Sequence, residues 1–358
     1  ELGIWGYALG YFLCYVPYSA LTKTIAEGRL PGIERPVSGF ALLPITTFTS
    51  MVGMFAFLTA MGWWKHAGRR SLPGARLLLG RALTLPFPGR WTFLSGLCTA
   101  AIIATTTLSY ALSGVSIMFM MLLMRGGVLV IAPLVDVLGR RRVRWFSWVA
   151  LASSLAGLLV TFASRASYAL TVVAAVDVIL YLTAYFIRLR AMSHIAKSDD
   201  VSARLRYFVE EQMVASPAIV LTLVAVAVLG GGSVMAAEIR SGFVTIWSSG
   251  AVLGGIAVGL LSQGTGIFGG LILLDPRENT FCVPVNRASS VLAGIVASYA
   301  MVLIFGGRPV PAPELVGAAL IIGAITALSI PPALEARRAR GAQINASERP
   351  STRLHPHS

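Results

Sequence analysis

Long apolar stretches, separated by short basic or Gly/Pro-rich turns, constrain this chain more than any other feature of its sequence. A helix needs about 20 predominantly apolar residues to cross a bilayer. We place ten such spans near residues 3–22, 40–64, 91–110, 114–138, 145–163, 167–187, 214–230, 243–273, 281–305 and 312–333. Only 12% of the residues are charged, against about a quarter in soluble proteins. The pattern excludes an ordinary water-soluble enzyme and predicts an all-α integral membrane protein with ten transmembrane helices.

The basic residues fall mainly on one set of alternate connections. Of the 29 Lys and Arg residues, 21 lie in the connections 65–90, 139–144, 188–213 and 274–280 or in the C-terminal tail, and 6 lie on the opposite set. Because cytoplasmic loops carry the excess of basic residues, we expect both termini of this multi-pass protein in the cytoplasm. Arginine outnumbers lysine 26 to 3, a bias of GC-rich genomes that favours a bacterial inner membrane.

Two segments outside the spans are predicted separately. The connector 188–213 between helices 6 and 7 has an apolar face (Leu205, Phe208, Val209 and Met213) and a largely opposite charged face (Arg204, Arg206, Glu210 and Glu211). Such a helix is typical of a connector that lies on the cytoplasmic membrane surface. The tail 334–358 is basic and poor in apolar residues, so we expect a disordered cytoplasmic end that is attracted to anionic lipid headgroups.

Metal and cofactor chemistry are not expected. The three cysteines, Cys14, Cys98 and Cys282, lie far apart in apolar surroundings and have no ligand spacing. Membrane lipids and a small-molecule substrate are the expected partners, nucleic acid is not, and a homodimer is left open. The first span lacks a basic n-region and a small-residue cleavage site, so we do not expect a signal peptide. Because the sequence starts at Glu1 and not at Met, we expect a few residues to precede it.

An internal similarity relates residues 114–162 to residues 281–328. Each segment begins with an apolar span that carries one arginine, continues through a Gly-containing turn, and ends in a span rich in small residues. The two copies are five spans apart, and because five is odd they must cross the membrane in opposite directions. We therefore predict two inverted five-helix repeats, residues 1–163 and 164–333. This architecture is typical of secondary transporters, whose substrate site lies between the repeats near the midplane.

The segment Val283–Gly294, which reads VPVNRASSVLAG, resembles the ninth span of the drug/metabolite transporter superfamily. The 5+5 arrangement resembles the same superfamily, as does the span, Gly turn and small-residue span at the end of each half. EamA-type permeases and nucleotide-sugar transporters share this plan. The resemblance covers nearly the whole chain and implies a permease fold, without indicating a particular substrate.

Charged residues inside the spans are the first candidates for a site. Arg125 lies near the middle of its span, and Arg287 holds the related place in the second repeat, beside Asn286. A charge at bilayer depth costs at least about 2.5–3.5 kcal/mol, so it must face a cavity or a partner. Two converging guanidinium groups would bind a carboxylate or phosphate. The alternatives are internal salt bridges or, for Arg287, snorkelling to the membrane edge. Asp177, also within a span, either neutralises Arg125 or binds a coupling proton.

Polar and aromatic residues on two other spans complete the candidate set. Tyr11, Tyr15 and Tyr18 follow the i, i+4, i+7 spacing of one helix face. This stripe forms either an interfacial aromatic belt with a kink at Pro17 or the wall of a cavity. Tyr110, Tyr181 and Tyr185 are weaker candidates of the same kind.

The glycine-rich eighth span contains the run 261–266, which includes Gln263 and Thr265. Small residues let helices approach closely in lipid, and this role accounts for most of the glycines. The alternative is that the run unwinds and offers Gln263 and Thr265 as hydrogen-bonding contacts to a substrate.

These observations favour a secondary transporter or exporter that moves a small polar, anionic metabolite by alternating access. A flippase for a lipid-linked headgroup is the alternative within the same fold. An integral-membrane enzyme that acts on a lipid or phosphate is the alternative from another class, although the spans lack paired histidines, HExxH and a Gly-x-Ser-x-Gly elbow.

Overall fold

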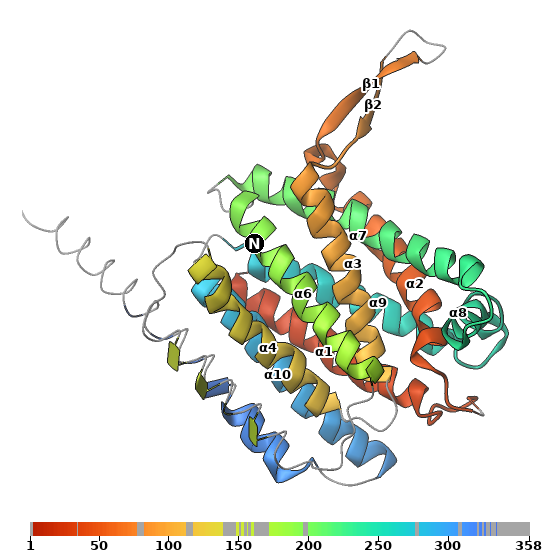
Figure 1. The fold of residues 1–358 in the computed structure, drawn as a ribbon, viewed down its shortest axis with the longest axis vertical. Helices are drawn as coiled ribbons and strands as arrows, with labels where there is room; N and C mark the ends of the chain where they lie inside the picture. The colour runs from red at the N-terminus through yellow and green to blue at the C-terminus, as the bar shows by residue number, and fades with distance from the viewer. Residues whose placement is uncertain are drawn as a thin grey trace, which may run out of the picture.

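A computed structural model describes most of the chain, and α-helices dominate it (Figure 1). The described residues are 3–33, 35–76, 82–111, 117–138, 172–195, 200–275, 279–306 and 310–320, with isolated positions at 148–149, 152–153, 156, 159–160, 322–323, 326, 330 and 334. The helices are α1 (Ile4–Ala26), α2 (Gly39–Ala60), α3 (Arg90–Ala111), α4 (Ile117–Leu138), α6 (Val172–Ile195), α7 (Val201–Leu229), α8 (Val234–Val244), α9 (Val252–Leu273) and α10 (Asn279–Phe305).

Six of these helices, namely α2, α3, α6, α7, α9 and α10, contain segments long and apolar enough to cross a membrane. This agrees with the predicted helical, multi-pass membrane protein. Helices α1 and α4, of 23 and 22 residues, occupy two further predicted spans. In the predicted span 312–333, residues 312–320 are helical. Most of the span 145–163, the turn 139–144 and the tail from residue 335 onward lie outside the described residues.

A β-hairpin, which the charge pattern did not predict, stands between α2 and α3. A short 3₁₀ helix (Trp63–His66) leads into β1 (Arg69–Arg76), which pairs antiparallel with β2 (Ala82–Pro86). The hairpin projects from one end of the helix bundle (Figure 1). Its base is tied to α7, because the Glu210 carboxylate accepts hydrogen bonds of 3.1 Å from the backbone N–H groups of both Gly68 and Gly89.

The prediction that residues 188–213 form a separate connector on the membrane surface is wrong. Helix α6 continues to Ile195, and residues 201–213 form the first part of the single 29-residue helix α7. The Asp200 side chain caps α7 by accepting from the N–H of Ser202 at 2.8 Å. Glu210 and Glu211, which were expected to face water, are buried. The charged face of this segment therefore meets polar groups inside the protein and not solvent.

The predicted span 243–273 is also interrupted. Helix α8 ends at Val244, a 3₁₀ turn follows at Ile246–Ser248, and α9 begins at Val252. Helix α9 is continuous through 261–266, so the alternative of an unwound run is wrong. Close packing explains its glycines: a Cβ on Gly259 would lie 2.6 Å from the Thr46 carbonyl oxygen, and a Cβ on Gly255 2.8 Å from the Ile45 side chain.

The helices enclose a polar interior. Helix α1 packs against α9 and α10, α3 against α6 and α7, α2 against α7, α8 and α9, and α4 against α6 and α10. Several buried residues between them are polar or charged, including three arginines, Arg125, Arg188 and Arg287. These buried polar groups mark the candidate site.

Candidate functional site

A cavity of about 80 Å³ lies among seven helices, α1, α3, α4, α6, α7, α9 and α10. It can hold several water molecules or a small solute. Seven of the nine candidate residues line it: Tyr11, Tyr15, Tyr18, Arg125, Gln263, Thr265 and Asn286. Arg287 lies beside the cavity, one residue after Asn286, and Asp177 is not among the lining residues.

Arg125 on α4 points into the protein, where 3% of it is exposed. Its guanidinium donates hydrogen bonds to the hydroxyls of Tyr181 and Tyr15. Its Cζ atom lies 5.3 Å from the centre of the Tyr15 ring and 5.4 Å from that of Tyr181, within the range of cation–π attraction. Tyr15 in turn shares a 2.7 Å hydrogen bond with the hydroxyl of Tyr110. Tyrosines from three helices thus surround this charge.

Arg287 on α10 approaches the same place from another direction. Only 1% of Arg287 is exposed, and its Nη1 donates to the Tyr181 hydroxyl at 3.3 Å. Its Cζ atom lies 4.6 Å from the centre of the Tyr185 ring. The hydroxyl of Tyr181 therefore accepts hydrogen bonds from both Arg125 and Arg287, and the two guanidinium groups converge on it.

The two converging arginines have no acidic partner within the part of the chain that is described. The ion pairs found there join Lys23 and Arg29 to Glu27, Arg188 to Glu211, and Arg206 to Glu210. The Nε atoms of Arg125 and Arg287 also lack a hydrogen-bond partner there. The interior thus holds two positive charges that tyrosines contact and that no carboxylate compensates.

Asp177 on α6 does not pair with Arg125, so the predicted internal neutralisation is wrong. Asp177 is 3% exposed, and among the described residues neither of its carboxyl oxygens has a hydrogen-bond partner. A buried carboxyl without partners destabilises a protein. Its other predicted role, in coupling, stays a prediction.

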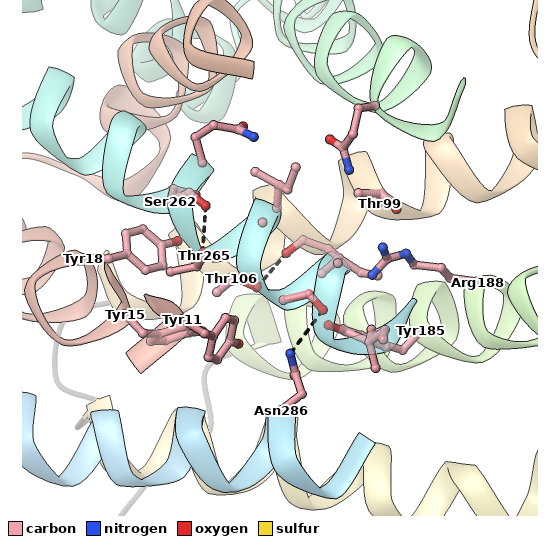
Figure 2. A pocket seen from close by; sticks show the side chains of 18 of the residues that line it. Tyr11, Tyr15, Tyr18, Thr99, Thr106, Tyr185, Arg188, Ser262, Thr265 and Asn286 are labelled. Atoms are coloured by element: carbon pink, nitrogen blue, oxygen red, sulfur yellow. Dashed lines mark hydrogen bonds between the residues drawn. The ribbon is translucent and has the colours of Figure 1, made fainter. Parts of the chain in front are cut away.

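The tyrosine stripe of α1 lines the cavity and is not an interfacial belt. Tyr11, Tyr15 and Tyr18 are all buried. The ring of Tyr15 lies 5.1 Å from that of Tyr11 and 5.6 Å from that of Tyr18, and the Tyr18 hydroxyl bonds to Thr107 Oγ1 at 2.9 Å. Figure 2 shows the three tyrosines along one side of the cavity.

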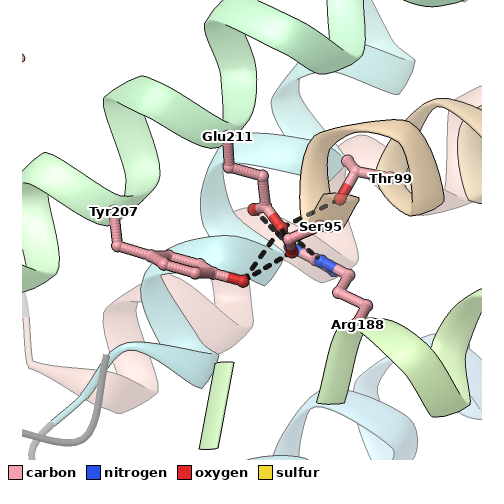
Figure 3. Close-up of polar contacts among 5 residues, drawn as sticks. All are labelled: Ser95, Thr99, Arg188, Tyr207 and Glu211. Carbon is pink, nitrogen blue, oxygen red and sulfur yellow. Dashed lines mark hydrogen bonds and ion pairs between the residues drawn. The ribbon is translucent and has the colours of Figure 1, made fainter. Parts of the chain in front are cut away.

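The third buried arginine, Arg188 on α6, lines the cavity and is paired with Glu211 (Figure 3). Its Nε and Nη2 atoms each lie 2.9 Å from a carboxylate oxygen of Glu211. Glu211 Oε1 also accepts from the hydroxyls of Ser95 at 2.5 Å, Thr99 at 3.0 Å and Tyr207 at 3.3 Å. The network joins α3, α6 and α7 and fixes Arg188 at the cavity wall.

Several lining residues were missed from the sequence: Thr99, Thr106, Arg188, Gln212 and Ser262. A signal for Arg188 was available, because Tyr181, Tyr185 and Arg188 follow the same i, i+4, i+7 spacing as the tyrosine stripe of α1. Counting Arg188 as a loop residue hid this relation.

Comparison with known proteins gives the fold alone. No family model and no curated protein matches the sequence. A solved crystal structure with 15% sequence identity matches over 93% of this chain and 98% of its own length, with a TM-score of 0.51. The fold and the site together define a class: a helical membrane protein with a buried, tyrosine-lined basic cavity.

Proposed function

We propose that this chain is a secondary transporter that moves a small polar metabolite with an anionic group across a membrane by alternating access. The observation that carries this proposal is the convergence of Arg125 and Arg287 beside the cavity without an acidic partner in the described chain. Burial of each charge at bilayer depth is costly, and the guanidinium fork fits a carboxylate or phosphate. An anionic solute would supply the missing charge. The site would bind and release its guest unchanged, so we propose a carrier and not an enzyme.

We also propose ten spans in two inverted repeats, residues 1–163 and 164–333, as in the drug/metabolite transporter superfamily. Helix packing supports this arrangement. We take α1, α2, α3 and α4 as the counterparts of α6, α7, α9 and α10, in that order. Exchanging counterparts turns the packed pair α1–α9 into α6–α3, the pair α2–α9 into α7–α3, and the pair α1–α10 into α6–α4. These three exchanged pairs also pack together in the structure. The pairs α2–α7 and α4–α10 exchange into themselves, and both are in contact. This exchange is expected of a pseudo-twofold axis.

Matching positions on the paired helices support the same relation. Arg125 of α4 and Arg287 of α10, which lie on helices paired by this exchange, are both buried and both donate to the Tyr181 hydroxyl. The tyrosine stripe of α1 has its counterpart on α6 in Tyr181, Tyr185 and Arg188, which are also buried. The two repeats would then contribute one arginine and one aromatic stripe each.

For coupling, we propose that Asp177 binds a proton, because this buried carboxyl has neither a hydrogen-bond partner nor an ion pair with Arg125 in the described part of the chain. The placement of both termini in the cytoplasm, in a bacterial inner membrane, is supported by the charge pattern. The charge count for the connections included Arg188, which lies at the cavity. Without Arg188, the large excess of basic residues stays on the same set of connections.

The test begins with a thermal-shift screen of small carboxylates and phosphates on the purified protein, because a ligand that binds the native state raises its apparent stability. Uptake of the best ligand into proteoliposomes follows. We expect Arg125→Gln to insert and fold but to lose the thermal shift and uptake. The matched control, Arg29→Gln, removes an exposed arginine paired with Glu27 and should retain both. Wild-type uptake by Arg125→Gln, or recovery of a chemically altered solute, would contradict the proposal.

A further inference from the structure

Three buried amide side chains at the cavity have unfilled hydrogen-bonding capacity. Gln212 on α7 is 3% exposed, lines the cavity and makes no hydrogen bond with the residues described. Asn286 Oδ1 has no partner there either, and its Nδ2 lies 3.5 Å from the Gly269 carbonyl oxygen. Gln263 Nε2 reaches only the sulfur of Met54, at 3.3 Å, and a thioether is a weak acceptor. Because buried polar groups are almost always hydrogen-bonded, these amides require partners.

Neutral polar groups surround the cavity and are not confined to one end. Figure 2 shows Asn286 of α10 on one side, with Thr99 of α3 and Ser262 of α9 across from it. No carboxylate lines the cavity among the described residues, and the charge of Arg188 is already compensated by Glu211. The lining thus combines uncompensated positive charge with a ring of amides and hydroxyls.

We infer that the guest is a small polyhydroxylated organic anion, whose charged end meets Arg125 and whose hydroxyls meet the amides. This inference rests on the proposed function and specifies its substrate class. A primary amide offers two N–H donors and one acceptor oxygen, and a hydroxyl both donates and accepts, so the two groups are complementary. An alkyl carboxylate of equal length would satisfy the arginine but leave the amides unpaired. A site built to bind hydroxyls rejects such an analogue strongly.

The experiment compares two six-carbon carboxylates that differ only in the hydroxyl groups on the chain: gluconate, which carries five hydroxyls, and hexanoate, which carries none. Binding to the full-length protein in detergent is measured by thermal shift and calorimetry. We expect gluconate to bind at least about tenfold more tightly, since each hydrogen bond contributes a factor of a few to tenfold. Gln212→Leu should reduce this preference by about tenfold. The control, Thr222→Val, changes an exposed position on the same helix and should leave it unchanged.

The outcomes separate this inference from the function on which it rests. Equal or tighter binding of hexanoate, lost in Arg125→Gln, would overturn the hydroxylated guest and leave the anion carrier standing. Binding of neither anion to the wild-type protein would overturn the hydroxylated guest, and failure of every carboxylate and phosphate in the thermal-shift screen would overturn the anion carrier as well. Gln212→Ala also removes the amide and serves as a second variant if Gln212→Leu fails to fold. An unchanged gluconate preference in a folded Gln212 variant would also overturn the inference.

Discussion

Replacing Glu211 by Gln removes the carboxylate that compensates Arg188 at the cavity. In the native structure Glu211 holds Arg188 through two hydrogen bonds of 2.9 Å and also accepts from the hydroxyls of Ser95 and Thr99. Glutamine has nearly the same shape, but it leaves a buried guanidinium without a counter-charge and turns an amide N–H₂ toward N–H donors. Breaking a buried pair in this way costs about 3–5 kcal/mol. We expect the free energy of unfolding of Glu211→Gln to fall by that amount.

A double variant distinguishes the loss of a pair from the exposure of a lone charge. Arg188→Met with Glu211→Leu removes both charges, and apolar replacement of a buried pair is often neutral or stabilising by about 1–4 kcal/mol. We therefore expect the double variant to be more stable than Glu211→Gln. Arg29→Gln is the matched control, because Arg29 and its partner Glu27 both reach solvent, and it should cost only about 0–1 kcal/mol.

Reversible unfolding in mixed detergent micelles, followed by circular dichroism, gives the free energies of unfolding of Glu211→Gln, the double variant and the control, each relative to the wild-type protein. The reasoning is refuted if Glu211→Gln unfolds within about 1 kcal/mol of the wild-type protein, a loss typical of an exposed pair. A double variant that is as unstable as the single one would refute it equally, because the loss would then come from packing and not from the unpaired charge.

Two further predictions concern the cavity and the unpaired acid. A Cβ on Gly269 would lie 3.0 Å from Tyr11 and 3.3 Å from Asn286 Nδ2, so Gly269→Ala should weaken anion binding roughly tenfold or more. The control is Gly266→Ala, whose Cβ would have its nearest atom at 3.9 Å and which should bind the anion as the wild-type protein does. Equal affinities of the two variants in calorimetry would contradict this prediction. Asp177→Leu should raise the free energy of unfolding by about 1–3 kcal/mol, because it removes a carboxyl that has no hydrogen-bond partner in the described chain. The same variant should lose proton-coupled uptake. A less stable variant would show that Asp177 has a structural partner.

Hydropathy located the six described helices that can cross a membrane, because a membrane imposes one length and one composition on every span. It failed where a helix crosses from an apolar to a polar environment inside the protein. Residues 201–213 carry enough charge to be read as a connector, yet they continue α7 without a break. Glu210 pairs locally with Arg206, but its partners in the hairpin base, and Arg188, which pairs with Glu211, lie outside this segment. No local pattern contains that information.

The candidate site was predictable in its parts and not in its assembly. A charge in a span, and an aromatic stripe at helical spacing, can both be recognised along one helix. That Tyr181 accepts from arginines of both α4 and α10 depends on how those helices pack against α6. The break at 245–251 was hidden because Thr245 caps the end of α8 and Ala251 the start of α9, and neither residue type marks a helix boundary in sequence.

The contrast among the three buried arginines bears most directly on function. Arg188 shows that this fold can compensate a guanidinium internally, with a bidentate carboxylate that three hydroxyls support. Arg125 and Arg287 receive only tyrosines among the described residues, although all three arginines lie at or beside one cavity. A purely structural role for the two arginines is the alternative. Arginines paired with carboxylates, as Arg188 is, would fill that role at a lower free-energy cost than two uncompensated buried charges. The uncompensated pair is therefore better explained by a negative charge that arrives and leaves with the guest.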